Sequence, residues 1–464
     1  RMRNFICLLI LFALTVSLCL RTFISILIVL MVRPPTANFN STIEIDDGLL
    51  DWSLEWKTYI LGIPLLGCVL SLPIYSGFLA QRFSPKRIVL CVIIFQSLLS
   101  FISPFIARFS FLAFLILRCL LGVAEGCVMP ALNTIAAAWF PPAERVFKVA
   151  IYTCGFQLSF GGVQYLVSFL SSLGVAWPII FYAGGVVGLL FCVVWMIFVA
   201  DSPSISRFIG LEERKFIDEH IPKTAKQLSP PWKAIFSSPV VLTHLLCMSG
   251  FYFAIGITSS LLPLYFTEEL GMDISKTGMF TFVPFIAQIV SKFIVGFIVD
   301  WRKKNAGLGH TTAAKICQTI GSMGSALSLF VLPFCHFNHW VAFAALLSYG
   351  LTFSLCVCGF YTSMTMIAPR YTGTITSLVT LVGMIFALLS IGVFRIFVEM
   401  GTDLKFFFLF GMAGVLQVIG GVAYLVWGTA DVQSWAIPPA PPSEIVMKPL
   451  LNNNNNNTKV AVRP

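Results

Sequence analysis

Three charged residues, Arg21, Arg118 and Glu125, lie in stretches of sequence that are otherwise apolar. A charge in the middle of a membrane-spanning helix costs about 2.5–3.5 kcal/mol to insert, so these side chains are expected to face partners or a wet cavity rather than lipid. Guanidinium groups bind anions, and a carboxylate can carry a proton. The three residues therefore predict a site in which Arg21 and Arg118 bind an anion and Glu125 couples to a cation. A structural network of ion pairs between helices is the alternative.

The spacing of Arg118 and Glu125 constrains how they act. Seven residues make almost two turns of helix, which places both side chains on one face, about 10 Å apart along the axis. We therefore do not expect them to pair directly. Gly122 and Gly126 lie beside them and predict a close approach by a neighbouring helix.

Two further cations, Lys292 and Arg395, lie within apolar stretches. Lys292 lies two turns before Asp300, so it either lines a substrate path or extends its ammonium towards the membrane surface. Arg395 lies four residues before Glu399, which favours an ion pair at the membrane interface over a ligand-binding role.

The composition identifies the class of protein that must position these charges. Of 464 residues, 58% are hydrophobic and 11% are charged. Soluble domains contain about 25% charged residues, so a soluble globule, a disordered chain and a coiled coil are excluded. The net charge of +10 is spread along the sequence rather than gathered in one patch, which argues against a nucleic-acid partner.

The 13 cysteines mostly lie inside apolar runs, which predicts buried small side chains rather than a disulfide scaffold. The sequence has no Cys and His spacing that is typical of a metal site. We therefore expect no metal, no cofactor and no enzymatic activity.

Twelve apolar stretches are long enough to cross a bilayer, for which a helix needs about 20 residues. They cover residues 5–32, 58–79, 88–107, 110–131, 147–173, 178–200, 241–265, 276–299, 313–334, 340–366, 374–398 and 405–428. The predicted fold class is an all-α membrane protein with twelve transmembrane helices.

The basic residues predict the orientation. With twelve spans, 21 of the 30 Lys and Arg residues fall on the side of both termini, five on the other side and four within spans. The positive-inside rule makes the basic side cytoplasmic. The loop after the first span then lies outside, and its Asn40-Ser41-Thr42 sequence is a predicted N-glycosylation site at Asn40.

A polar stretch at residues 201–240 separates six spans from six. It divides the chain into an N-terminal half, residues 1–200, and a C-terminal half, residues 241–428. Within the stretch, residues 211–217 predict a short amphipathic helix. The tail, residues 429–464, is rich in Pro and Asn and is predicted to be disordered.

Two loops at equivalent places in the halves repeat one pattern, 219 residues apart. In each, a glycine is followed by a polar or acidic residue four positions later and then by basic residues: Gly77, Gln81 and Arg82 after the second span, and Gly296, Asp300 and Arg302 after the eighth. The repeat predicts two pseudo-symmetric halves with a substrate path between them near the midplane. We expect the charged residues of these loops to form contacts between neighbouring helix ends that favour one access state and so act in gating. The alternative is that they only contribute to the positive-inside charge bias.

These loops resemble the signature of the major facilitator superfamily. Other motifs resemble its anion/cation symporter branch, which includes type I sodium–phosphate cotransporters, sialin and vesicular glutamate transporters. They are Arg21-x-x-x-Ser25, Arg118-x-x-x-Gly122-x-x-Glu125-Gly126, Trp139-Phe140-Pro141-Pro142-x-Glu144-Arg145 and Ile367-Ala368-Pro369-Arg370-Tyr371-x-Gly373. The resemblance implies anion binding by Arg21 and Arg118 and proton coupling by Glu125.

The chain departs from the vesicular glutamate transporters at Gly62, Phe251, Ser363 and Met366, where polar or charged residues align. We therefore expect a different or less polar anion than glutamate. The leading hypothesis is a secondary-active transporter that moves an organic or inorganic anion with H⁺ or Na⁺ by alternating access. A transport-dead receptor or scaffold, and a facilitator of neutral or cationic solutes, are the alternatives. We expect a monomer in the plasma membrane or in an endolysosomal or secretory vesicle membrane.

Overall fold

The computed structural model of the chain describes residues 2–24, 27, 31, 50, 52, 56–221, 230–261, 265, 270, 274–401 and 404–437. Within this part, twelve helices are long and apolar enough to cross a membrane. The predicted number of spans and the all-α fold class are confirmed. The predicted fourth span, 110–131, ends too early, because the apolar helix continues to Trp139.

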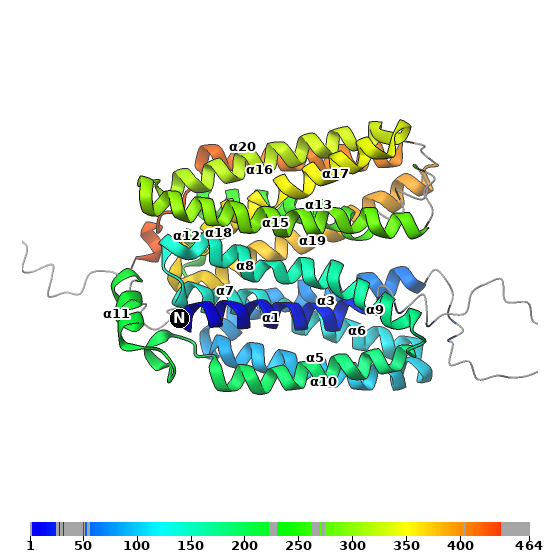
Figure 1. The fold of residues 1–464 in the computed structure, drawn as a ribbon, viewed down its shortest axis with the longest axis horizontal. Helices are drawn as coiled ribbons and strands as arrows, with labels where there is room; N and C mark the ends of the chain where they lie inside the picture. Colours follow the sequence, from blue (N-terminus) through cyan, green and yellow to red (C-terminus); the bar gives the residue numbers. More distant parts are fainter. Residues whose placement is uncertain are drawn as a thin grey trace, which may run out of the picture.

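The helices form two groups that lie above one another in Figure 1. The N-terminal group contains α1 (Met2–Thr22), α3 (Trp56–Ile74), α5 (Pro85–Phe109), α6 (Phe111–Gly126), α7 (Val128–Trp139), α8 (Arg145–Gln157), α9 (Gln164–Ser172) and α10 (Trp177–Phe198). The C-terminal group contains α13 (Pro239–Ser260), α15 (Ile274–Ala306), α16 (His310–Val331), α17 (His339–Phe353), α18 (Thr362–Met364), α19 (Thr372–Glu399) and α20 (Lys405–Trp427).

Local sequence explains where several of these helices begin. Ser84 accepts a hydrogen bond from the backbone N–H of Arg87 and precedes a proline at the first position of α5. Ser110 accepts one from Ala113 at the start of α6. Such side chains satisfy N–H groups that have no partner within the helix, which fixes the turn between two spans.

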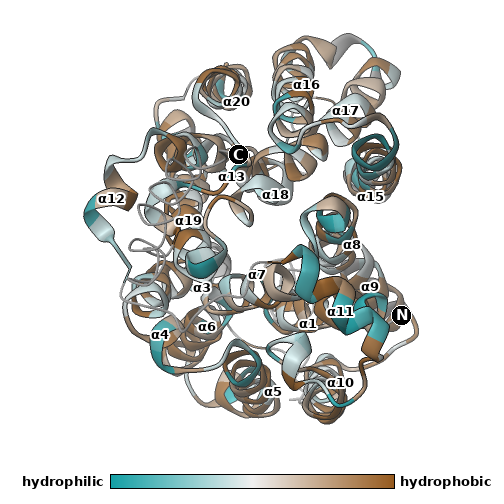
Figure 2. Cartoon of the chain, turned by 90° about the vertical axis from the view of Figure 1, so that its left-hand side faces the viewer, coloured by the Kyte–Doolittle hydropathy of each residue, from teal (hydrophilic) through white to brown (hydrophobic). Residues whose placement is uncertain are grey.

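One end of the bundle, which we call the terminal face, carries the N-terminus and the short helices α11 (Leu211–His220) and α12 (Trp232–Ser237) (Figure 1). Figure 2 looks onto this face, where α11 is largely hydrophilic while most of the spanning helices are hydrophobic. The predicted short helix at 211–217 is confirmed as part of α11.

The prediction of disorder from residue 429 onward is wrong for residues 429–437. Gln433 donates a backbone hydrogen bond to Ile367 O over 2.9 Å, and Thr311 bonds to the Asp431 carboxylate over 2.9 Å. These bonds to the C-terminal group hold the segment on the terminal face, although its composition is typical of disorder. Residues 438–464 lie outside the described residues.

Arg3 holds the N-terminus against Glu144 and against the polar stretch at residues 201–240. Its guanidinium lies 2.9 Å from a Glu144 carboxylate oxygen and 3.0 Å from one of Glu213, and it stacks over the Phe216 ring. The backbone N–H groups of Met2 and Arg3 also donate to Glu213. These contacts fasten α11 to α1.

Acidification is expected to weaken this contact. Burial raises the pKa of Glu213, but hydrogen bonds from the N–H groups and side chain of Arg3 and Met2 outweigh it, so the net pKa lies below its usual 4.5. The contribution of the ionised group is therefore present above pH 4.5 and is lost as the pH falls through the lower native value. Amide hydrogen exchange of α11, corrected for intrinsic rates, should accelerate below pH 4.5.

Glu213→Gln should make exchange in α11 fast already at pH 7, whereas Glu212→Gln on the same helix should behave like the wild type. Equal protection of α11 in all three proteins would contradict this role of Glu213.

The predicted close approach at Gly122 and Gly126 occurs against α3. A Cβ atom on Gly122 would lie 1.9 Å from the Pro64 carbonyl oxygen, and one on Gly126 would lie 2.2 Å from Ser71 Oγ. Cys68 also donates to the carbonyl of Gly122 over 3.1 Å. The two helices thus touch backbone to backbone, which only glycine permits.

Gly122→Ala is expected to destabilise the protein by about 1–3 kcal/mol, because backbone atoms must move apart to admit the methyl group. The matched control is Gly62→Ala on α3, where an added Cβ meets nothing within 4 Å. Thermal unfolding in detergent should show a lower melting temperature for the first variant alone; equal melting temperatures would contradict the packing argument.

The two groups meet along α3, α7 and α8 of the N-terminal group and α15 and α19 of the C-terminal group. Figure 1 shows α8 and α15 running side by side across the middle. Near the terminal face, buried Arg145 donates to Thr365 O over 3.1 Å, and Asn133 donates to the Tyr361 hydroxyl over 3.2 Å. These bonds join the groups at that end.

Candidate functional site

The three charges predicted to form the site lie where α1 meets α6. Arg21 is in the last turn of α1, and Arg118 and Glu125 are on α6. Arg21 Nε lies 2.8 Å from Glu125 Oε2, and the two side chains are 11% and 7% exposed. An ion pair thus connects the helices, and in this conformation the Glu125 carboxylate, rather than a ligand, pairs with the guanidinium of Arg21.

Arg118 is the residue of the site that has hydrogen-bond donors left to bind a ligand. Its side chain is fully buried, and its Nη2 donates to the backbone carbonyl of Arg21. Among the described residues, its Nε and Nη1 have no hydrogen-bond partner. Buried donors without acceptors are costly, and hydrogen bonds between a guanidinium and an anion are about twice as strong as neutral ones. With two cations and one carboxylate, the site has a surplus positive charge suited to an anion.

Glu125 also lines a small cavity between the two groups of helices. The cavity has a volume of about 20 Å³ and receives side chains from both groups, among them Ser17 of α1, Phe156 of α8, Tyr252 of α13 and Thr380 of α19. This volume suffices for about one water molecule. A solute reaches Glu125 only after the helices separate.

Lys292 does not extend to the membrane surface, which was one of its two predicted roles. It is 2% exposed, and its Nζ donates to Thr153 O over 3.2 Å and to Gln157 Oε1 over 2.9 Å. Both acceptors belong to α8, so Lys292 bridges the two groups of helices. Its side chain remains in the interior, as the substrate-path hypothesis requires.

The two segments predicted as loops are helical in the structure. Residues 77–82 lie in a π-helix (Tyr75–Leu79) and in α4 (Ala80–Arg82), and residues 296–302 lie in α15. Asp300 accepts a hydrogen bond from the backbone N–H of Phe147 on α8 over 2.8 Å and pairs with Lys303 at 3.4 Å. Gly296 packs against the same helix, where a Cβ would lie 3.2 Å from Phe147 Cα. The segment of the C-terminal group therefore contacts the other group.

In the first segment, Gln81 and Arg82 make local contacts. Gln81 donates to the carbonyl of Gly77 one turn earlier, and Arg82 lies over the Phe78 ring. Arg302, in the second segment, likewise lies over its neighbour Trp301. Of the acidic or polar residues at the repeated position, Asp300 has a described contact with the other group, whereas Gln81 bonds within its own segment.

The departures from the glutamate transporter pattern have different surroundings. Gly62 faces open space. Phe251 stacks on Phe353 at 4.4 Å between ring centroids. Ser363 accepts a hydrogen bond from the Tyr424 hydroxyl over 2.5 Å and lies 3.1 Å from His244 Nε2. Met366 is buried.

The sequence reasoning missed two buried basic residues on α8, of which Arg145 lies at the junction of the groups. Arg145 and Lys148 count as loop charges in the orientation argument, yet they are 2% and 7% exposed. Arg145 donates to the carbonyls of Ala137 and Phe140 as well as to Thr365. Its place in the Trp-Phe-Pro-Pro motif was the available signal.

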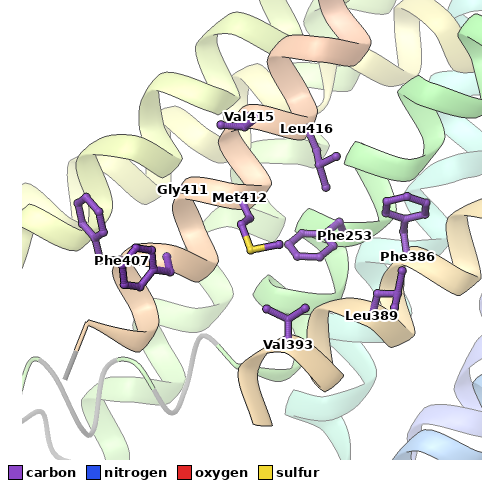
Figure 3. A pocket seen from close by; sticks show the side chains of 10 residues that line it. Phe253, Phe386, Leu389, Val393, Phe407, Gly411, Met412, Val415 and Leu416 are labelled. Atoms are coloured by element: carbon purple, nitrogen blue, oxygen red, sulfur yellow. The ribbon is translucent and has the colours of Figure 1, made fainter. Parts of the chain in front are cut away.

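A larger hollow, of about 420 Å³, lies between α13, α19 and α20 (Figure 3). Apolar side chains line it, such as Phe253, Phe386 and Met412. It contains no charged group, so it offers nothing that would hold an anion.

The remaining sequence predictions concern Arg395, the cysteines, a metal site and Asn40. Arg395 pairs with Glu399 at 2.8 Å on an exposed surface, as the spacing predicts. All 13 cysteines are free, and eleven of them are buried. The described residues contain no group of three or more His, Cys, Asp or Glu that could hold a metal ion. Asn40 lies outside the described residues.

The sequence matches a known protein family and is similar to known transporters. Residues 6–391 match the family described as Major Facilitator Superfamily. The chain is 28% identical over 399 residues to the uncharacterized transporter slc-17.3 of Caenorhabditis elegans, covering 84% of this chain and 74% of that protein. It is 26% identical to vesicular glutamate transporter 3 of Danio rerio (91% and 72%) and to sodium-dependent phosphate transport protein 3 of Mus musculus (83% and 80%).

Solved structures share the fold. The proton:xylose symporter XylE, bound to 6-bromo-6-deoxy-D-glucose, has a TM-score of 0.68 at 16% identity, covering 93% of this chain and 97% of that one. A bacterial homologue of the iron transporter ferroportin, in an outward-facing state, has a TM-score of 0.64 at 13% identity, covering 92% and 99%.

Proposed function

This chain belongs to the Major Facilitator Superfamily, and from that premise we propose that it moves a small anion across the membrane together with H⁺ or Na⁺. It is a multi-pass membrane transporter rather than an enzyme. The observation that carries the proposal is the buried Arg118 guanidinium, two of whose donors have no partner in the described part of the chain, beside the Arg21–Glu125 ion pair.

The names of the relatives agree with an anionic solute. They include transporters of glutamate and phosphate and a probable urate exporter of Mus musculus, and all three solutes are anions at neutral pH. We expect a solute less polar than glutamate, because Phe251 and Met366 stand where charged residues align in the vesicular glutamate transporters.

Glu125 is the proposed coupling residue. Its carboxylate neutralises Arg21, so protonation would free that guanidinium for the anion. The binding of a proton and of an anion would then assist each other, which is the thermodynamic basis of symport. In this proposal the terminal face is cytoplasmic, as the distribution of basic residues predicts.

Uptake into proteoliposomes containing the full chain tests the proposal. Radiolabelled phosphate, glutamate and urate would each be offered under an imposed pH gradient, a Na⁺ gradient, or neither. We expect one gradient to drive accumulation of at least one anion above protein-free liposomes. If none accumulates and none exchanges in counterflow, the chain is not an anion transporter. Binding without flux would support the receptor alternative.

A further inference from the structure

Lys292 is a buried cation that bonds only neutral oxygens. Thr153 O and Gln157 Oε1 accept from its ammonium, and within the described part of the chain no carboxylate lies within 4.0 Å of it. A buried ammonium is usually paired with an anion, because desolvation is otherwise uncompensated. Lys292 therefore has the charge to bind an anion that this conformation does not supply.

The acceptor side chain is oriented by a second bond. Gln157 Nε2 donates to Gln288 Oε1 over 2.7 Å, and Gln288 lies one turn before Lys292 on α15. The amide of Gln157 is thus held with its oxygen towards Lys292. The residue before it, Phe156, lines the cavity at Glu125. The polar cluster of Lys292, Gln157 and Gln288 therefore adjoins the central site, which is formed by Arg21, Arg118 and Glu125.

The cluster lies between the central site and the terminal face. Thr153 is eight residues from the start of α8 at that face, a rise of about 12 Å. Glu125 is 14 residues from Trp139, where α7 ends at the same face, a rise of about 21 Å. By this count Thr153, to which Lys292 donates, is about 9 Å nearer the terminal face than Glu125.

In alternating access the two groups of helices separate at one face at a time. Because α8 and α15 belong to different groups, opening of the terminal face moves these two helices apart. Separation breaks both bonds of Lys292 and leaves its ammonium in the opened path. We propose that Lys292 is a second anion-binding site, used when the terminal face is open, and that Thr153 and Gln157 take the place of the anion when that face is closed. The proposal rests on the anion transport proposed above.

A purely structural lock between α8 and α15 is the competing explanation, and Gln157→Leu separates the two. This variant removes the acceptor but keeps the cation, whereas Lys292→Gln removes the cation. A lock predicts that both variants open the terminal face and change affinity in the same direction. An anion site predicts a loss of affinity at the terminal face for Lys292→Gln alone.

The experiment measures KM at each face separately for whichever of phosphate, glutamate or urate the wild type accumulates, in vesicles whose orientation is read from protease access to a C-terminal tag. We expect Lys292→Gln to raise KM at the terminal face about tenfold, the loss of one charge-assisted hydrogen bond, and to leave KM at the opposite face within about twofold. Gln157→Leu should not raise KM at the terminal face, and Arg395→Gln should match the wild type at both.

Equal KM changes for Lys292→Gln at the two faces, or parallel changes in Lys292→Gln and Gln157→Leu, would overturn the proposal. Should Lys292→Gln fail to fold, Lys292→Arg retains the charge and should keep KM at the terminal face within about threefold, and a tenfold rise there would equally overturn it. Absence of flux in the wild type would instead refute the proposed function, on which this site depends.

Discussion

Replacing Arg118 with glutamine is expected to lower anion uptake by at least about 100-fold. The guanidinium presents Nε and Nη1 without an acceptor on any described residue, and each charge-assisted hydrogen bond to a bound anion contributes about 1.5–3 kcal/mol. Two such bonds amount to about 3–6 kcal/mol, which corresponds to a factor of 10² to 10⁴ in affinity. Uptake by proteoliposomes at several anion concentrations measures the effect.

The matched control is Arg395→Gln, because it removes the same group from an exposed ion pair far along the chain. It should transport like the wild type. Arg118→Lys should recover little, since an ammonium lacks the planar fork that can present two parallel donors. Wild-type uptake by Arg118→Gln, in protein that remains monodisperse, would remove the anion-binding role from this residue.

The Arg21–Glu125 ion pair provides the second large effect, on stability. Removing one partner of a buried pair costs about 3–5 kcal/mol because the other charge is left uncompensated. Glu125→Gln should be the worse single change, since it leaves both Arg21 and Arg118 buried without a carboxylate. Arg21→Gln should be milder, because Arg118 still interacts electrostatically with Glu125.

A double-mutant cycle measures the pair directly. Arg21→Gln with Glu125→Gln should be more stable than the sum of the two single losses predicts, since no unpaired partner remains. Thermal unfolding in detergent gives the comparison. Additive losses would mean that the 2.8 Å contact contributes no coupling and that Glu125 is held by other interactions.

The sequence was sufficient for the architecture because hydropathy dominates it. Twelve spans, a division between two groups of helices and the helix at 211–217 follow from apolar length and periodicity, which bilayer thickness constrains strongly. The glycines of α6 also predicted a close contact, and the structure identifies Pro64 and Ser71 on α3 as the neighbours.

The pairing of the charges could not be read from the sequence. Insertion cost identifies Arg21, Arg118 and Glu125 as inward-facing, but it does not say which arginine the carboxylate meets. That choice depends on the rotation of α1 against α6. For the same reason Arg145 counted as a loop charge: its position near a helix end suggests exposure, but it donates to carbonyls of both groups of helices and is buried between them.

The unequal number of charges at the central site has an electrical consequence. Two guanidinium groups and one ionised carboxylate leave the empty site with a charge of +1. In the proposed symport a proton on Glu125 and a monovalent anion bind together, so the loaded site also has a charge of +1. Moving one elementary charge across 100 mV involves about 2.3 kcal/mol, so the membrane potential acts equally on the loaded and the empty carrier. One proton and one monovalent anion then cross without net movement of charge, and the potential does not drive their accumulation.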